Sequence, residues 1–468
     1  MIPWNPVGLA TAIGAELGPE VVRDAVLTDV VIDSRAAGPG KVFVALPGRR
    51  VDGSDFVAEA VAKGSPLAVV GRPMPGPIAW VDDPVAALGH LAELALRRAR
   101  VAAGDLKVIG LTGSVGKTTT KDLLARITAQ IGPTVAAEAS FNNRIGVPLT
   151  VVRADRDTAF VIVEMGANHE GEISRLTRIA PPDIGLVLGV GKAHIGEFGS
   201  RKAIARAKSE LLAGLTPQGT AVLNMDDPLV RAMAFGAPEK LVTFGFDDMA
   251  RIRGTRPGLG PDGRLRLTVA DQDAGLVTHV HTALVGRHMA INVVAAMAAA
   301  IAAGVSLFDA AEALEGAGPA SPHRMALRDL PGGALLLDDS YNANPESMAA
   351  AIGTAARLAK RSRRRVVAVL GEMRELGGES QGEHERVGRL AARQGIERLV
   401  VVGAGARGIA TGAATAGVPA AAVEFWPGAE GLADHLRSTT DKQDFILVKG
   451  SNGTELWKVA DSLIGDQC

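Results

Sequence analysis

The sequence predicts an α/β protein of three domains, and three observations support that fold class. The chain has 468 residues, which is too long for one core, because single hydrophobic cores stop growing at roughly 250 to 300 residues. Short β-branched runs alternate with helix-length stretches, the rhythm of βαβ units and of a mostly parallel sheet. Hydrophobic residues make up 47% of the chain and charged residues 22%, as in globular proteins.

The first domain is expected to be a small α/β unit covering residues 1–104. It closes at the breaker-like end Ala102-Ala103-Gly104. β-Branched and apolar runs predict its strands, and the longer mixed stretches predict its helices. We expect strands at 30–32, 42–44 and 67–70, and helices at 55–63 and 84–100.

The second domain, 105–318, is expected to hold a mostly parallel sheet with helices on both faces, because its strands are continuously apolar. Between 241 and 285 the pattern changes to short alternating runs, which predicts a small antiparallel patch attached to this domain. We expect main strands at 108–111, 160–163, 184–188 and 221–223, and helices at 117–129, 291–303 and 307–314.

The third domain, 319–468, is expected to be a Rossmann-like α/β unit. The Gly- and Pro-rich stretch 316–322 precedes it and is the best linker in the chain. We expect strands at 335–337, 366–370, 399–402 and 445–448, and helices at 345–360, 383–394 and 454–464.

Composition excludes several classes of function. Lys and Arg number 50 against 51 Asp and Glu, so no global positive field recruits nucleic acid or anionic lipid. Cys468 is the only cysteine, which excludes a disulfide framework and suits a reducing cytoplasm. The start lacks a signal-peptide pattern, and the longest apolar stretch, 293–305, is too short to span a bilayer. We therefore expect a soluble, cytoplasmic protein.

A glycine loop follows the strand at 108–111 and opens a helix. Its sequence, Gly113-x-x-Gly116-Lys117-Thr118, suits phosphates held by backbone N–H groups, a lysine and a Mg²⁺-binding hydroxyl. The spacing is shorter than in the common P-loop, since Leu111 stands where the first glycine would be. The alternative is a simple helix-capping turn, but three threonines after Lys117 are unfavourable in a helix without a purpose.

Three further side chains carry candidate chemistry. Glu164 ends the strand at 160–163, where open α/β sheets place ligand-facing groups, and it is a suitable Mg²⁺ ligand; the alternative is a salt bridge at the sheet edge. His194 and Lys208 are not natural Mg²⁺ ligands. Their own chemistry favours phosphate contact or, for Lys208, a solvated helix face.

The polar cluster 338–345, Asp-Asp-Ser-Tyr-Asn-Ala-Asn-Pro, joins a buried strand to a helix that Pro345 starts. An N-cap loop would explain one or two of these residues. It would not explain all of them, and Tyr341 is the only tyrosine in the chain.

These motifs together resemble the Mur ligase family, the ATP-dependent amide-forming enzymes of peptidoglycan precursor synthesis, over nearly the whole chain. The loop at 112–119 is shared with folylpolyglutamate synthetases as well. The motifs at 141–148, 164–169 and 338–345 resemble more narrowly the members that add D-alanyl-D-alanine to UDP-N-acetylmuramoyl-tripeptide.

The resemblance implies a catalytic set of Lys117, Glu164, His194 and Lys208, with two Mg²⁺ ions held by Thr118, Glu164, His194 and a carbamylated Lys208. Carbamylation would turn that ammonium into an oxygen donor. ATP would be bound by Thr112, Gly113, Ser114, Val115, Gly116, Lys117, Thr118, Thr119, Asn292, Arg324 and Asp339.

The resemblance also places UDP on the first domain and the other substrates near the second and third. The residues expected to bind substrate are Ser34, Arg35, Asn142, Asn143, Asn342 and Asn344. Three departures weaken single contacts: Met289 where Asn is frequent, Ser54 where His is frequent, and Asn452 where Arg is usual.

The implied reaction activates the tripeptide carboxylate as an acyl phosphate, which the amine of D-alanyl-D-alanine attacks. Closure of the third domain over ATP would gate it, with 316–322 as the hinge, in a monomer. One rival is a folylpolyglutamate synthetase, which lacks the first domain and the 338–345 motif. Another is a nucleotide-binding regulator without turnover, which the intact set of four catalytic residues disfavours.

Overall fold

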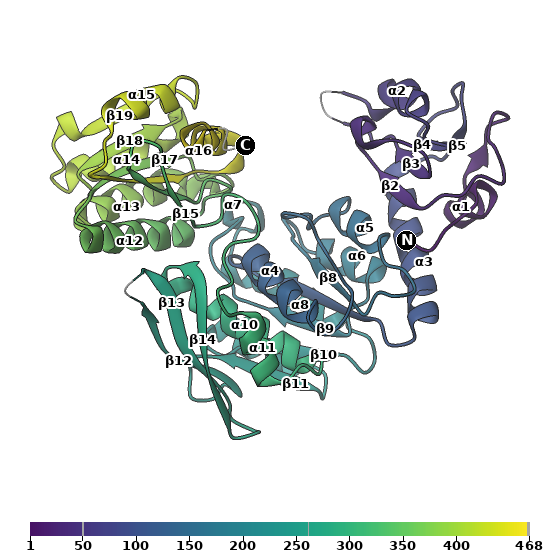
Figure 1. The fold of residues 1–468 in the computed structure, drawn as a ribbon, viewed down its shortest axis with the longest axis horizontal. Coiled ribbons are helices and arrows are strands. Elements are labelled where there is room, and N and C mark those ends of the chain that lie inside the picture. Colours follow the sequence, from purple (N-terminus) through teal and green to yellow (C-terminus); the bar gives the residue numbers. More distant parts are fainter. Residues whose placement is uncertain (49–50, 261, 466–468) are drawn as a thin grey trace.

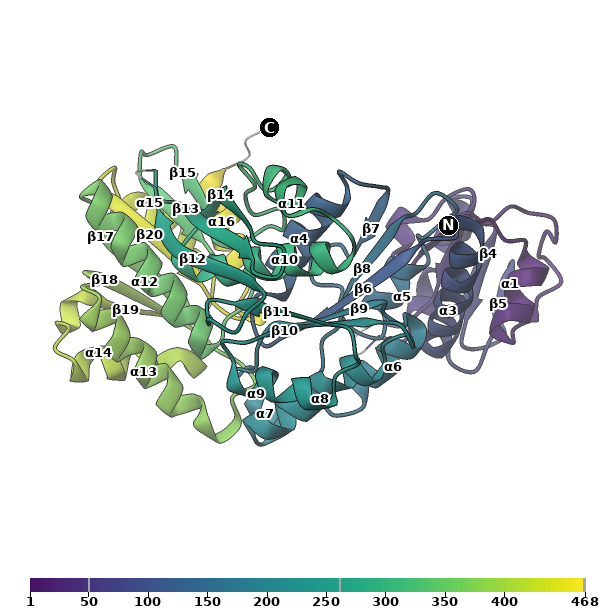
Figure 2. The same ribbon diagram turned by 90° about the horizontal axis from the view of Figure 1, so that it is seen from below.

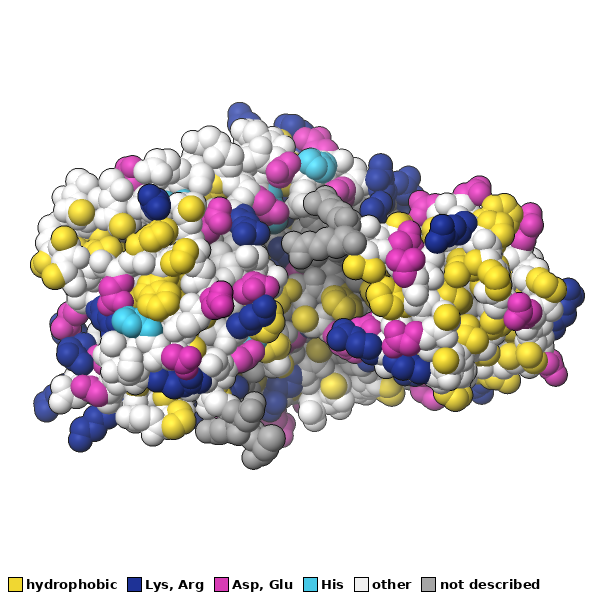
Figure 3. Space-filling model, turned by 90° about the horizontal axis from the view of Figure 1, so that it is seen from above, with side chains coloured by type: hydrophobic (Ala, Val, Ile, Leu, Met, Phe, Trp, Pro, Cys, Tyr) yellow, Lys and Arg dark blue, Asp and Glu magenta, His cyan; other side chains and the backbone are white. Residues whose placement is uncertain are grey.

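The computed structural model describes residues 1–48, 51–260 and 262–465, so Cys468 lies outside the described chain. Three β-sheets follow one another along the sequence (Figure 1), and each is built from one continuous segment, within 16–80, 107–285 and 326–449. We refer to them with their helices as the first, central and third units. Seen from above, the first and third units face each other across a recess (Figure 3).

The first unit has a five-stranded sheet in the order β1-β5-β4-β3-β2. Its four later strands are parallel, and β1 pairs antiparallel with β5. The three predicted strands are present, whereas two very short ones, β1 and β5, were missed. The elements are α1 (Pro6–Ile13), β1 (Glu16–Leu17), β2 (Asp29–Val31), β3 (Lys41–Val44), α2 (Val57–Ala62), β4 (Leu67–Val70) and β5 (Ile78–Trp80).

One long helix, α3 (Pro84–Ala103), joins the first unit to the central one (Figures 1 and 2). Asp83 caps it by accepting hydrogen bonds from the N–H groups of Val85 and Ala86, as expected for an N-cap carboxylate. Near its other end, Arg100 forms an ion pair with Asp183, at 2.8 Å between Nη2 and Oδ2. The helix is therefore fastened to both units.

The central unit has a nine-stranded sheet in the order β14-β13-β12-β11-β10-β9-β6-β8-β7. The strands from β7 to β12 in this order are joined by parallel pairs, and β12, β13 and β14 are antiparallel. They are β6 (Lys107–Thr112), β7 (Thr134–Ala136), β8 (Phe160–Glu164), β9 (Ile184–Val187), β10 (Thr220–Asn224), β11 (Leu241–Gly245), β12 (Ile252–Leu259), β13 (Arg264–Asp271) and β14 (Leu276–Val285).

The prediction for 241–285 needs a correction at one strand. The predicted antiparallel patch is confirmed for β12 to β14, which extend one edge of the central sheet. The first strand of the segment, β11, is parallel to β10. Residue alternation indicates which face of a strand is buried, and it carries no information on the direction of the neighbouring strand.

Helices cover both faces of the central sheet, as predicted. Alternate residues of β8 belong to different cores: Ile162 packs with α4 and α10, and Val161 packs with α5, α6 and α8. The described part of the chain holds no helix long and apolar enough to cross a membrane. The helices are α4 (Lys117–Thr128), α5 (Gly146–Val151), α6 (Glu172–Ile179), α7 (Ile195–Phe198), α8 (Arg201–Ala213), α9 (Pro228–Arg231), α10 (Ala290–Ala302) and α11 (Leu307–Ala313).

The third unit has a six-stranded sheet in the order β15-β16-β20-β17-β18-β19, parallel except for β15. The four predicted strands are β16, β17, β18 and β20. The elements are β15 (Ala326–Asp329), β16 (Leu335–Asp338), α12 (Pro345–Ser362), β17 (Arg365–Gly371), α13 (Ser380–Arg393), β18 (Arg398–Val402), α14 (Arg407–Thr415), β19 (Val423–Trp426), α15 (Leu432–Thr439), β20 (Asp444–Lys449) and α16 (Leu456–Ile464).

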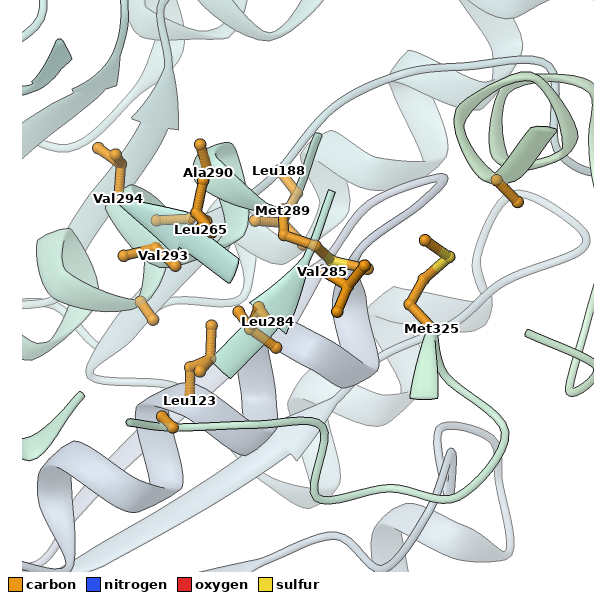
Figure 4. Close-up of a cluster of buried hydrophobic side chains, with 14 of the residues drawn as sticks. Leu123, Leu188, Leu265, Leu284, Val285, Met289, Ala290, Val293, Val294 and Met325 are labelled. Carbon is orange, nitrogen blue, oxygen red and sulfur yellow. The ribbon is translucent and has the colours of Figure 1, made fainter. Parts of the chain in front are cut away.

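The predicted linker is anchored at both ends. The N–H of Gly316 donates to the carbonyl of His281 in β14, and the N–H of Ser321 donates to Asp122 in α4. Just after the linker, Met325 is buried in the central core beside Val285 (Figure 4). The third unit is thus seated on the central unit at the point where its chain begins.

Candidate active site

The strand order places the candidate site at the centre of the nine-stranded sheet. Strand β6 lies between β8 and β9, so the connections leave it toward opposite sides. In open α/β sheets, ligands bind outside the carboxyl ends of the strands at such a switch point. The carboxyl ends of β6, β8 and β9 bring Thr112, Glu164 and Leu188 to this edge.

The glycine loop joins β6 to α4, and the side chain of its lysine, Lys117, folds back onto the loop backbone. The Nζ of Lys117 donates to the carbonyl of Gly113 at 2.8 Å, and burial lowers the pKa of Lys117, opposed by the charge of Glu164. The hydroxyls of Thr112 and Ser114 are buried and have no hydrogen-bond partner among the described residues. Unpartnered buried donors beside the N-terminus of a helix suit the oxygens of a phosphate group.

Gly116 is required for two reasons. Its φ of 83° lies in the left-handed region that favours glycine. A Cβ on it would stand 2.3 Å from Oδ1 of Asn292, so Asn292, at the start of α10, lies directly against the loop. The loop predicted from sequence and the asparagine predicted by resemblance are therefore in contact.

A continuous hydrogen-bond network joins the loop to the next strand. The Thr118 hydroxyl donates to Oε2 of Glu164 at 3.0 Å, and Nδ2 of Asn142 donates to Oε1 of the same carboxylate at 2.8 Å. Thr118 also contacts the hydroxyl of Ser140 at 2.8 Å. Glu164 is almost completely buried, and its carboxylate is bound by a hydroxyl and an amide; no salt bridge to the described residues holds it, as the alternative would require.

Arg324, from the third unit, completes this network. Its Nη2 donates to the hydroxyls of Thr118 and Ser140, at 3.2 and 3.0 Å, and its guanidinium stacks over the ring of Tyr341, 4.1 Å from the ring centroid. Its Nε is buried without a partner. An unpaired N–H on a guanidinium at this place suits a phosphate oxygen.

Two of the four predicted metal ligands lie together in the structure. The Thr118 hydroxyl and the Glu164 carboxylate are adjacent hard oxygen donors, as Mg²⁺ prefers. His194 contacts the third unit: its Nδ1 is 2.5 Å from Oε2 of Glu375, and this contact lowers the pKa of Glu375. Across the described residues, no three His, Cys, Asp or Glu side chains gather as metal ligands.

Lys208 is buried in α8, not solvated. Burial, together with the positive charge of Lys117, lowers the pKa of Lys208 to about 7, and no hydrogen bond or ion pair to the described residues holds its ammonium. A large share of it is therefore the neutral amine at neutral pH. The solvated-face alternative is wrong, because the side chain is 4% exposed.

The acidic and amide residues after β16 are used partly by the protein itself. Asp339 pairs with the buried Lys449 and accepts the N–H of Met325, and burial lowers the pKa of Lys449. Asn342 is exposed. The side chain of Asn344 caps α12 in a capping box with Ser347, which leaves its amide nitrogen for a ligand.

The remaining predicted substrate residues lie apart from the loop. Asn143 accepts the N–H groups of Ile145 and Gly146 at 3.0 Å, so its carbonyl oxygen shapes the turn before α5. In the first unit, Ser34 donates to Glu59 at 2.9 Å, and Arg35 is exposed and paired with Asp33. Ser34 and Arg35 thus have their partners within the first unit.

A cavity of about 360 Å³ opens beside the glycine loop. Val115 and Asn292 form its wall toward the loop, and Glu346 of α12 closes it from the third unit, with its Oε2 buried and unpartnered. It is lined by Val115, Leu188, Gly189, Val190, Gly191, Lys192, Arg201, Asn224, Asp227, Ile291, Asn292 and Glu346.

Sequence reasoning missed the contacts that hold the third unit against the central one. The Nζ of Lys192 lies 2.8 Å from Glu383 and 3.0 Å from Glu379, and its N–H donates to Glu346 at 2.9 Å. Ser140, Lys192, Glu346 and Glu375 were not singled out. Their partners lie far along the chain, so no local spacing marks them.

Comparisons with known proteins agree with this geometry. Three family models match: "Mur ligase family, catalytic domain" at residues 27–93, "Mur ligase middle domain" at 111–300, and "Mur ligase, glutamate ligase domain" at 323–452. The UDP-N-acetylmuramoyl-tripeptide--D-alanyl-D-alanine ligase of Mycobacterium tuberculosis is 41% identical across all of this chain and 98% of its own length. That of Escherichia coli is 35% identical, covering 97% of each.

Solved structures show the same likeness. MurF from Acinetobacter baumannii superposes with a TM-score of 0.84 at 32% identity, covering 99% of both chains. MurF ligase from Thermotoga maritima, solved in complex with ADP, gives a TM-score of 0.74 at 27% identity, covering 92% of this chain and 96% of that one.

Proposed function

The chain belongs to the Mur ligase family, and from that premise we propose that it joins D-alanyl-D-alanine to UDP-N-acetylmuramoyl-tripeptide at the expense of ATP, in peptidoglycan precursor synthesis. The observation that carries this proposal is the 41% identity across the whole chain to a ligase of that name. The motif residues Asn142 and Glu164, in direct contact at the site, support it independently.

The proposed chemistry follows from the acid–base properties of the substrates. An amine and a carboxylic acid in neutral water exchange a proton and do not condense. We propose that the tripeptide carboxylate attacks the γ-phosphorus of ATP, which breaks the bond to the ADP oxygen and forms an acyl phosphate. The neutral amine of D-alanyl-D-alanine then attacks the acyl carbon, phosphate leaves, and the amine nitrogen loses its extra proton.

The chain's own residues would act on this reaction by position and charge. Lys117 and the loop N–H groups would hold the β- and γ-phosphates, and the free Nε of Arg324 would meet the transferring phosphoryl group. Mg²⁺, when bound at Thr118 and Glu164, would neutralise charge on the phosphate oxygens.

We propose a second metal-binding group from Lys208 and His194. A neutral Lys208 amine reacts with CO₂ to give a carbamate, which is an oxygen donor, and its lowered pKa supports this. His194 would have to leave Glu375 to join it.

The base and ribose of ATP would occupy the cavity of about 360 Å³ beside the loop, where Glu346 offers an unpartnered acceptor to hydroxyl or amino groups. UDP would bind the first unit at Ser34 and Arg35.

We further propose domains at 1–104, 105–318 and 319–468, with 316–322 as the hinge. The three sheets support these boundaries, because all strands of each sheet lie within one of these ranges. We also propose a monomer in the cytoplasm; the single cysteine suits that reducing compartment.

An assay of ADP release tests the proposed function. Release is expected only when UDP-N-acetylmuramoyl-tripeptide and D-alanyl-D-alanine are both present, and Lys117→Met is expected to reduce it by at least about 100-fold. Release with tetrahydrofolate and glutamate would indicate a folylpolyglutamate synthetase instead. ATP binding without release under any of these conditions would indicate a nucleotide-binding regulator.

A further inference from the structure

Arg324 contacts residues of the central unit that are far from it in sequence, and these contacts do not include an ion pair. Within the described residues no carboxylate lies in salt-bridge distance of it. Its contacts are the two hydroxyls of Thr118 and Ser140 and the face of the Tyr341 ring. Hydroxyls alone orient a guanidinium weakly, because each offers one acceptor site here.

We propose that Tyr341 is a positioning residue that holds the Arg324 guanidinium over the phosphate loop. When the third unit packs against the central unit, this guanidinium is then already oriented to bind the phosphoryl group. A cation over an aromatic face is attracted by the ring quadrupole when it lies within about 6 Å of the centroid. The 4.1 Å separation satisfies this and also stacks the planar guanidinium on the ring.

The backbone around both residues supports the pairing. Tyr341 donates its N–H to the carbonyl of His323, next to Arg324 in the chain. His323 and Met325, on either side of Arg324, have φ values of 58° and 51°. Left-handed conformations are unfavourable for such residues and persist only where the surroundings impose them. Here they turn Arg324 toward the central unit.

Met325 shows how that conformation is imposed. Its side chain is buried in the core of the central unit, beside Val285 (Figure 4), and its N–H donates to Asp339 at 3.1 Å. The backbone of Arg324 is thus fixed by the buried side chain of the next residue, Met325, and its guanidinium is held by the ring of Tyr341.

The ring of Tyr341 and not its hydroxyl should carry this role. The described residues provide no hydrogen-bond partner for the hydroxyl. Replacement by phenylalanine keeps the aromatic face, whereas replacement by leucine removes it at similar bulk.

The first experiment measures kcat and the KM for ATP, and so rests on the proposed function. Tyr341→Leu is expected to lower kcat by about 3-fold to 30-fold, the range of a cation–π contact, with a smaller change in KM. Tyr341→Phe is expected to restore most of the loss. In an Arg324→Met background, Tyr341→Leu should have little further effect, since the pair acts together.

The matched control is Phe425→Leu on β19, which removes a ring from beneath another guanidinium, that of Arg407 at the start of α14, 4.7 Å from the ring centroid. It is expected to leave kcat unchanged. The proposal is overturned if Tyr341→Phe loses as much as Tyr341→Leu, or if the two losses multiply in the double variant.

A second experiment does not depend on ligase activity. Tyr341 is the only tyrosine, so 3-fluorotyrosine gives a single ¹⁹F NMR resonance from the folded protein. Arg324→Met is expected to shift that resonance without any substrate, and Arg407→Met is not. An unshifted resonance overturns the positioning role even if ligation is confirmed, whereas a shift in a protein without ligase activity supports the contact and refutes only the proposed reaction.

Discussion

The buried side chains of the site have electrostatic surroundings that set their chemistry. Lys208 is buried, and the positive charge of Lys117 acts on it. Two ammonium groups that share a buried region cannot both stay protonated without cost. No carboxylate of the described residues offsets these two effects, burial and the charge of Lys117, so Lys208 loses its proton at a lower pH than an exposed lysine does.

This predicts how carbamate formation depends on pH. Only the neutral amine reacts with CO₂, so the carbamate on Lys208 is expected to increase as pH rises through about 7. With ¹³C-bicarbonate, a single ¹³C NMR carbamate signal should appear and follow that profile. Lys208→Ala should abolish it. Lys107→Ala, which removes a lysine bound to the carbonyl of Ala303, should keep it, and a signal that survives in Lys208→Ala would contradict the assignment.

At the scale of elements, residues adjacent in sequence were enough to predict the phosphate loop. Contacts between residues far apart in sequence could not be predicted in this way. Gly113, Gly116 and Lys117 identify a phosphate loop because all of its parts are adjacent in sequence. The same holds for the strands that end at Glu164 and Asp338. The ring of Tyr341 under Arg324 and the contact of Ser140 with Thr118 depend on how separate segments fold together, which hydrophobic periodicity does not record.

The shortest strands were missed because hydrophobic periodicity needs several residues to be visible. Strands β1 and β5 have two and three residues, too few to show a period. His194 occupies the N-cap position of α7 and contacts Glu375, and its role as a metal ligand stays a prediction from the resemblance. No feature of the sequence near His194 indicates a partner 181 positions later.

The cap of α12 gives a prediction at this scale. Asn344→Ala removes the acceptor of the Ser347 N–H, at 2.8 Å, and is expected to destabilise the first turn by about 1 kcal/mol. Hydrogen exchange should then be faster at the amides of 346–348, and Asn344→Asp should retain protection. Asn143→Ala, at the turn before α5, is the matched control and should affect only that turn. Unchanged exchange in Asn344→Ala would show that the cap is dispensable.

At the scale of the molecule, the third unit is held to the central one by few but specific contacts. Lys192 bridges to Glu383, which is 6% exposed, and to the more exposed Glu379. Gly196 and Gly377 meet so closely that a Cβ on Gly196 would lie 2.6 Å from the N of Gly377. These contacts belong to the seated arrangement and must break if the units separate.

Loss of the bridge is therefore expected to favour the separated arrangement. Lys192→Met leaves Glu383 with only Arg386 as partner, at an expected cost of about 1 to 2 kcal/mol to the seated state. Small-angle scattering should show a larger radius of gyration. Arg206→Met, which breaks the exposed pair with Glu170 inside the central unit, should leave it unchanged. Equal radii of gyration for wild type and Lys192→Met would show that Lys192 does not stabilise the packing of the third unit on the central unit.

The three sheets also bear on how the protein is made. None of them borrows a strand from another, since their strands lie within 16–80, 107–285 and 326–449. As the nascent chain leaves the ribosome at about 5 to 20 residues per second, each sheet has all of its strands before the next sheet has its first. Arg324 and Tyr341 emerge only after the phosphate loop they meet is already part of a complete sheet, so biosynthesis ends by fitting the last unit onto a finished surface.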